Sequence, residues 1–219
     1  MFKKILLITA VLFSACSTVE DVPLPFESTN EKATEFFNKA VYHIDQGEWR
    51  EGRDNFQSAL RVDPNFIMAN MWGWSEDPVQ TRKYRETAIA NKENANDAER
   101  IMIEMMEAGR EGKASKRLDL AKKLVNKYPS SSEAHVMLGN VYTGQDKLDE
   151  AIESYENALE INPDNYNAWK QLARHHIVIG NNNMLPKDKQ DKSKAIKYAE
   201  EMLRIRPKAP NAHQYRANI

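Results

Sequence analysis

The sequence predicts an all-α fold, a solenoid of stacked helix–turn–helix units, on three observations. Charged residues make up 29% of the 219 residues, while Gly (8) and Pro (9) are few, a composition that favours helices. Two helix-like runs end alike, in ALRVDP at Pro64 and in ALEINP at Pro163, and a proline after such a run stops a helix. The spacing of these helix ends follows one period, which indicates a repeated unit.

Four prolines mark this period along the chain. Pro129 and Pro163 are 34 residues apart, and Pro64 and Pro129 are 65 apart, close to two periods. Pro163 and Pro207 are 44 apart, which is one period and an insertion of ten residues. A period of 34 residues suits two helices and their turns.

The clearest unit spans residues 132–165. Its marker positions are His135, Leu138, Gly139, Tyr142, Ala151, Tyr155, Ala158 and Pro163. In type and spacing they resemble the tetratricopeptide repeat, with His135 and Tyr155 as ring-for-ring replacements. Small residues at three of these positions would let two helices approach closely, while the larger side chains fill the seam. The resemblance implies an array in which each unit buries its apolar face against the next.

The resemblance extends over residues 32–219, more clearly in some units than in others. The predicted units are 33–66, a degenerate unit 67–97, 98–131, 132–165, 166–209 and a partial unit 210–219. Unit 166–209 contains a polar, turn-rich insertion, 181–193, which we expect to be a surface loop between its two helices. The partial unit is either a short closing cap or the start of a further repeat in a truncated sequence, and we favour the second.

The N-terminal part of the chain does not resemble the repeats but a secretion signal. Two lysines precede a short apolar run, as in a secretory signal, and the run is too short to span a bilayer, which takes about 20 residues. The letters LFSAC, ending at Cys16, resemble the lipobox of bacterial lipoproteins. We therefore predict a signal peptide at 1–15 and lipidation of Cys16. No Asp follows Cys16 directly, which by the same resemblance indicates an outer-membrane location in a bacterial envelope.

Residues 16–31 are predicted to be a flexible tether between the lipid and the repeats. Their sequence contains two prolines and no helical period, as is typical of linkers.

Neither a catalytic site nor a metal site is predicted. Acylation would leave no thiol for a nucleophile, because Cys16 is the only cysteine.

Four of the five histidines fall on positions where the repeat packs aromatic rings. His175 and His176 are neighbours, about 100° apart on a helix, which does not suit ligation of one metal ion. With 31 basic and 32 acidic residues, the chain is too mixed in charge for a nucleic-acid binder. We expect no enzyme, no cofactor and no nucleic-acid partner.

The resemblance implies that a peptide or partner protein binds to the concave face, which the first helices of the units line. The candidate positions are Val136, Asn140, Thr143, Asn167, Lys170, Arg174 and Ile177. Lys170 and Arg174 share one helix face, and with the amide of Asn140 they would hold a carboxylate. A solvated basic face is the alternative.

The predicted function is that of an envelope-anchored interaction adaptor. Two alternatives remain open. One is a lipoprotein that binds glycans through Trp72 and Trp74, and the other is a regulatory subunit of a larger envelope complex.

Overall fold

The computed structural model describes residues 20–218, apart from 177, 180–181, 184 and 187–188. Its elements in chain order are α1 (Glu31–Gln46), α2 (Trp49–Val62), α3 (Ile67–Trp72), α4 (Pro78–Ala90), the 3-10 turn η1 (Lys92–Asn94), α5 (Asp97–Arg110), α6 (Ala114–Lys127), α7 (Ser132–Thr143), α8 (Leu148–Ile161), α9 (Tyr166–His176), β1 (Val178–Ile179), β2 (Asn182–Asn183), α10 (Lys192–Ile205) and α11 (Pro210–Ala217). The predicted all-α solenoid is confirmed. Strands β1 and β2 form only a short antiparallel pair after α9.

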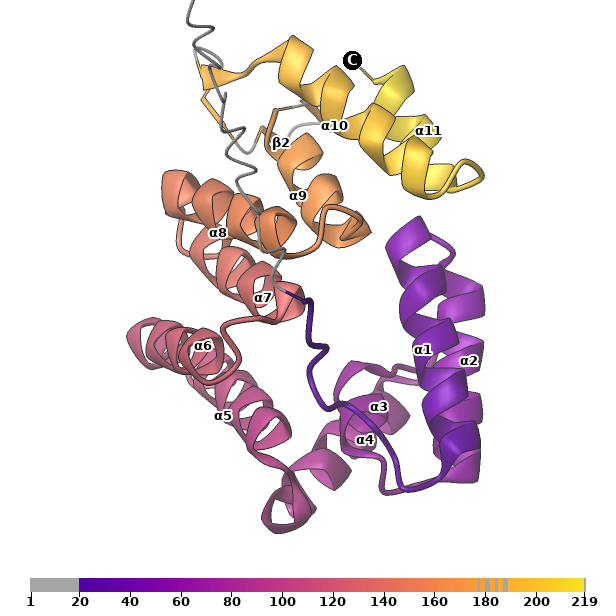
Figure 1. Ribbon diagram of the computed structural model, residues 1–219. Helices are drawn as coiled ribbons and strands as arrows, with labels where there is room; N and C mark the ends of the chain where they lie inside the picture. Colours follow the sequence, from indigo (N-terminus) through magenta and orange to yellow (C-terminus); the bar gives the residue numbers. More distant parts are fainter. Residues whose placement is uncertain (1–19, 177, 180–181, 184, 187–188, 219) are drawn as a thin grey trace, which may run out of the picture.

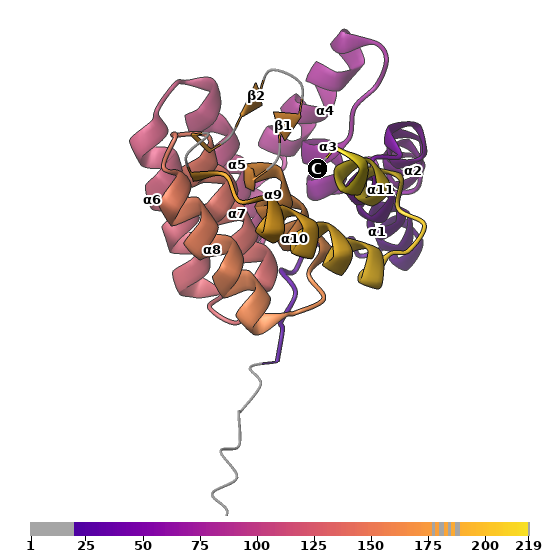
Figure 2. The same ribbon diagram turned by 90° about the horizontal axis from the view of Figure 1, so that it is seen from above.

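Successive helices pack in pairs, and the pairs stack around a curved path (Figure 1). Helices α1 and α2, α5 and α6, α7 and α8, and α9 and α10 pack most closely on each other, and the shorter α3 packs on α4. Seen from above, the first helices α1, α7 and α9 lie toward the middle, whereas α2, α6 and α8 lie toward the outside (Figure 2). The curvature brings α11 back against α1, so the array closes on itself.

One side-chain position makes the same hydrogen bond in four of the units. The pairs, side chain to carbonyl oxygen, are Asn70 to Pro64 (2.8 Å), His135 to Pro129 (3.2 Å), Trp169 to Pro163 (2.8 Å) and His213 to Pro207 (2.8 Å). A carbonyl oxygen only accepts, so the side-chain nitrogen donates in each pair. The bond ties the turn after one unit to the first helix of the next. Asn70 makes this bond although α3 is short, so the start of α3 occupies the same position relative to the preceding proline as the first helices of the other units.

Gly139 allows α7 and α8 to approach each other. A Cβ atom at this position would lie well under 3.0 Å from the ring of Tyr155, a side chain that is fully buried. The phenol is also fixed, because its hydroxyl donates to Asn140 Oδ1 at 3.0 Å. The ring therefore has no free space into which it can move.

Replacing Gly139 by alanine is expected to lower the free energy of unfolding by about 1–3 kcal/mol, because it overpacks the seam. Gly144→Ala, at the C-terminal end of the same helix, is the matched control. Its Cβ would meet only backbone oxygens, at 3.5 Å or more, and its φ of −68° suits alanine. Urea unfolding followed by circular dichroism measures both, and equal losses in the two variants would contradict the close packing at Gly139.

The insertion in unit 166–209 packs against the helices that it separates. Leu185 is buried, and its N–H donates to His175 O at 3.3 Å. The N–H of Asp191 donates to His176 Nδ1 at 3.2 Å, and α10 begins at Lys192. Leu185 therefore packs against the helices, whereas Pro186 and Lys189 are exposed, as expected of a surface loop; residues 181, 184 and 187–188 lie outside the described residues.

The N-terminal signal falls outside the part of the chain that the structure describes. Residues 1–15 and Cys16 precede Glu20, which is the first residue that the structure describes. Among the helices of the described part, none is both long enough and apolar enough to cross a membrane.

Candidate peptide-binding site

Helices α7 and α9 bring several of the predicted site residues together. The Tyr155 hydroxyl donates to Asn140 Oδ1 and lies 3.0 Å from Thr143 Oγ1. Arg174 is exposed, and its positive charge acts on the nearby phenols of Tyr155 and Tyr215. The exposed groups of this part of the predicted face are therefore the Arg174 guanidinium and the Asn140 amide, whereas the Tyr155 side chain is buried.

Three other predicted residues take different places. Val136 is buried in the core, so its side chain is not available to a partner. Asn167 is half-buried, and its Oδ1 accepts a hydrogen bond from Gln171 Nε2 at 3.3 Å. Ile177 lies outside the described residues.

Lys170 takes a carboxylate from its own chain. Its ammonium lies 3.0 Å from Asp45 Oδ1 of α1, and the two side chains are only 15% and 16% exposed. The expectation that Lys170 and Arg174 together hold a ligand carboxylate is corrected here, because Asp45 already neutralises Lys170. Arg174 alone remains exposed.

Asp45 and Lys170 belong to a polar contact that joins the first helix to the last ones, which we call the closure contact. It consists of Tyr42, Asp45, Tyr166, Lys170, Arg206 and Asn211. The Arg206 guanidinium lies between the rings of Tyr42 and Tyr166, 4.5 and 4.4 Å from their centroids, a favourable cation–π arrangement. Arg206 is also 3.9 Å from Asp45, whose backbone oxygen accepts from Asn211 Nδ2 at 2.5 Å. These contacts hold the array closed.

A buried polar network lies between α7, α8 and α9. His175 Nδ1 is 2.7 Å from Gln171 O, so Nδ1 carries the proton, and Nε2 faces Thr143 Oγ1 at 3.3 Å. Burial lowers the pKa of His175 and of His176. Burial also raises the pKa of Tyr155 to about 12, against the effects of Thr143 and Arg174. Both histidines and the phenol are thus neutral at physiological pH, consistent with packing roles.

Lowering the pH from about 7.5 to about 5.5 is expected to reduce the stability that His175 and His176 contribute, whereas burial raises the pKa of Glu99 and Glu133, which act in the opposite direction. The folded-state pKa of both imidazoles lies below the ordinary value of about 6.5, so the unfolded chain binds more protons. This contribution to stability is complete above about pH 6.5 and is lost as the pH falls toward the folded-state pKa. His175→Gln should reduce the pH dependence measured by circular dichroism; the same slope in both chains would show that His175 does not contribute.

A second candidate site is occupied by the chain itself. Residues 20–28, which we call the strap, were expected to belong to a flexible tether, but they lie extended across one edge of the array (Figure 1). At its start, the Asp21 carboxylate accepts from the N–H and hydroxyl of Ser132 at 2.9 and 2.7 Å, and from Asn162 Nδ2 at 2.7 Å. The N–H of Val22 donates to Ser130 O at 2.9 Å.

The rest of the strap continues along the same edge. The N–H of Leu24 donates to Glu133 Oε2 at 3.3 Å, and Pro25 O accepts from Asn96 Nδ2 at 2.7 Å. The side chains of Leu24 and Phe26 are 5% and 6% exposed. The Phe26 ring packs edge-on against Trp72, with 5.6 Å between the centroids. Sequence reasoning missed this site, although the alternation of apolar residues with prolines in VPLPF is a signal for it.

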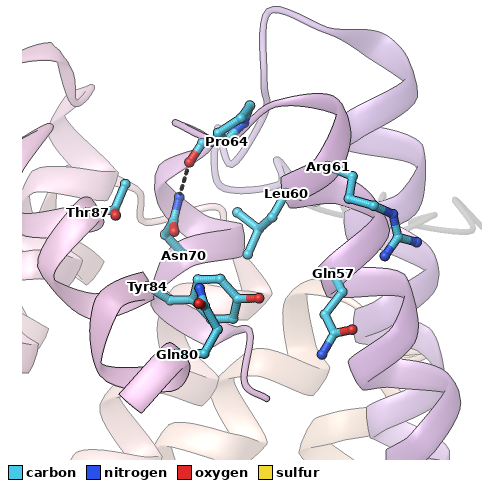
Figure 3. Close-up of a pocket in the computed structure, with 8 residues that line it drawn as sticks. All are labelled: Gln57, Leu60, Arg61, Pro64, Asn70, Gln80, Tyr84 and Thr87. Carbon is cyan, nitrogen blue, oxygen red and sulfur yellow. Dashed lines mark hydrogen bonds between the residues drawn. The ribbon is translucent and has the colours of Figure 1, made fainter. Parts of the chain in front are cut away.

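The tryptophans proposed for glycan binding do not act together. Trp72 packs between Phe26 and Phe37, whereas Trp74 packs against Phe56 and the exposed Trp49. Neither lines the open pocket of about 330 Å³ between α2, α3 and α4 (Figure 3). That pocket is lined by Gln57, Leu60, Arg61, Pro64, Asn70, Gln80, Tyr84 and Thr87. Among the described residues, no cluster of three or more His, Cys, Asp or Glu could hold a metal ion.

Comparison with known proteins identifies the repeat. Residues 132–165 match the family model described as tetratricopeptide repeat, so the chain contains this repeat. No curated protein matches the sequence as a relative.

Several solved structures are similar over most of the chain. YrrB, described as a tetratricopeptide repeat protein with an unusual peptide-binding site, is 16% identical, covers 85% of this chain and 93% of its own, and has a TM-score of 0.45. A tetratricopeptide repeat protein from Parabacteroides merdae is 14% identical, with 86% and 72% covered and a TM-score of 0.47. PilW, a type IV pilus biogenesis factor, is 16% identical, with 86% and 90% covered and a TM-score of 0.44. At these identities and TM-scores, none of their functions carries over to this chain.

Proposed function

We propose that this chain is an interaction scaffold that binds a peptide or partner protein on the inner face of its repeat array. The observation that carries the proposal is the exposed guanidinium of Arg174 on α9, directly before His175, whose ring packs on the Tyr155 phenol with 5.6 Å between the centroids. Asn140 on α7 is exposed beside the same phenol. An exposed cation next to hydrogen-bonding groups suits a carboxylate, either an acidic side chain or a chain terminus.

The partner is tested first by crosslinking from the inner face. A photoreactive amino acid replaces Asn140 in one chain and Glu153, exposed on the outer helix α8, in another. We expect a specific crosslinked protein from position 140 and none from position 153. Identical crosslinks from both positions would count against the inner face as the binding surface.

The captured partner is then used to test Arg174 in purified form. Arg174→Ala should weaken its binding at least about tenfold, because a hydrogen bond to a charged group contributes about 1.5–3 kcal/mol. The melting temperature should not change. Arg110→Ala, which removes an exposed guanidinium from the end of α5, is the matched control. Oligosaccharide titration followed by tryptophan fluorescence tests the glycan alternative. A glycan-binding protein should show a change in fluorescence, whereas a protein-binding scaffold should show none.

We further propose that the scaffold is anchored to the bacterial envelope, at the outer membrane, by lipid on Cys16. The support is the resemblance of LFSAC to a lipobox and the single cysteine. Cys16→Ser is expected to leave an unprocessed or soluble chain, whereas the wild type, held by several acyl chains, should stay with membranes through a salt wash. Recovery of the mutant as mature protein in the membrane fraction would refute the anchor.

A further inference from the structure

We propose that the edge of the array under the strap is a peptide-binding site for extended segments of the pattern Asp-x-x-Leu-x-Phe. The chain's own strap occupies this site, and a partner segment with the same chemistry can take its place. The site is separate from the inner face around Arg174, so the two can be tested apart.

The acidic residue of the pattern is bound by hydrogen-bond donors of the array. Asp21 receives three hydrogen bonds, two from Ser132 and one from Asn162. Ser132 is the first residue of α7, so the carboxylate also lies at the positive end of a helix dipole. Asn162 comes from the turn after α8, at the other end of the same unit. A carboxylate held from two helix termini positions one end of an extended peptide.

The main chain of the segment also forms hydrogen bonds with the array, and these do not depend on the side chains of the segment. The N–H groups of Val22 and Leu24 donate to the array, and the carbonyl of Pro25 accepts from it. Proline occupies positions 23 and 25, which have no N–H to leave unpaired. Proline also holds the segment extended before it binds, which reduces the entropy lost on binding. These are the means by which extended peptides are commonly recognised.

Two apolar side chains supply the remaining contacts. Leu24 and Phe26 point into the core, while Val22, Pro23, Pro25 and Glu27 are exposed. The strap thus lies on the helices with one face toward solvent, and none of the described helices lies over it in Figure 1. Removing it requires no helix to unfold, which makes exchange with another segment physically accessible.

The covalent link gives the strap an advantage over a free peptide. Only Thr29 and Asn30 separate it from α1, and such short connections give effective concentrations in the millimolar range. A free peptide should therefore bind the intact protein weakly and bind well once the strap's own anchors are removed.

The test uses a fluorescent peptide with the sequence of residues 20–29, EDVPLPFEST, and fluorescence anisotropy. In the full chain, Asp21→Ala with Leu24→Ala weakens the strap. We expect this chain to bind the peptide at least ten times more tightly than the wild type does. The same peptide with Ala in place of Phe26, and a scrambled peptide, should not bind. A further Trp72→Ala substitution, which removes the partner of the Phe26 ring, should reduce binding.

The proposal is overturned if the weakened chain, with its helical circular dichroism intact, binds the peptide no better than the wild type. Equal binding of the scrambled peptide overturns it as well. If the weakened chain is not helical, a full chain with a protease recognition sequence inserted after Glu27 is folded first and then cut. Exchange of its strap for labelled peptide supports the proposal, and a strap that stays bound without exchange refutes it. Neither result bears on crosslinking at position 140, so the inner-face function stands or falls separately.

Discussion

Replacing Phe26 by alanine is expected to lower the free energy of unfolding by about 3 kcal/mol, the lower part of the range for a buried phenylalanine. The ring is 6% exposed and packs on Trp72, which in turn stacks on Phe37 of α1. Loss of the ring would therefore leave a cavity in the apolar cluster shared by the strap, α1 and α3. Such a loss shows directly as a lower urea midpoint in circular dichroism.

Val22→Ala is the matched control within the same segment. The side chain of Val22 is 52% exposed, and its N–H bond to Ser130 does not depend on the side chain, so this change should be within about 0.5 kcal/mol of neutral. A flexible tether would make both variants neutral. That result would show that the strap is not bound in solution.

Replacing Asp45 by alanine is expected to open the array. The substitution leaves the cations of Lys170 and Arg206 facing each other without their shared anion. Breaking a buried ion pair costs about 3–5 kcal/mol, and breaking an exposed one about 0–1 kcal/mol. The three side chains are 15–19% exposed, so we expect a loss of about 2–3 kcal/mol. Small-angle scattering should also show a larger radius of gyration.

An exposed ion pair on the same helix provides the control. Glu35 pairs with Lys39 one turn away on α1, with side chains 61% and 54% exposed. Glu35→Ala should leave the urea midpoint nearly unchanged and the radius of gyration unchanged, because exposed ion pairs contribute little to stability. In a double-mutant cycle, Asp45→Ala and Lys170→Ala should be clearly non-additive. Additive effects, or a loss no larger than that of Glu35→Ala, would mean that the closure contact does not hold the array together.

The repeat was predictable because its signals are local. Units 33–66, 98–131, 132–165 and 166–209 each carry a proline stop, and Gly139 opposite Tyr155 can be recognised within 16 residues of sequence. The ring-to-carbonyl bond explains why histidines occupy aromatic positions: His135 and Trp169 donate to the proline carbonyl in the same way. Asn70 also makes this bond without a ring, so the start of α3 keeps the contact although the sequence there lacks the aromatic signature.

The closure contact was not predictable from the pattern, because it depends on curvature added up over the whole array. Asp45 and Lys170 are 125 residues apart in the chain, and nothing local distinguishes Lys170 from the exposed Arg174 one turn later. The strap was missed for a related reason. Several of its bonds use main-chain groups, which leave no mark on the sequence, and its partners lie up to 141 residues away.

If Cys16 carries lipid, the position of Asp21 sets how freely the array can move above a membrane. Cys16 precedes Asp21 by only five residues, which span at most about 18 Å when fully extended. If Cys16 carries lipid, the start of α7 and the turn after α8 stay within that distance of the headgroups. The short linker would then limit both the distance of the array from the bilayer and the side that faces it. Release of the strap would roughly triple the connecting chain, to the 15 residues that separate Cys16 from Glu31, and would extend the reach of the protein to about 50 Å.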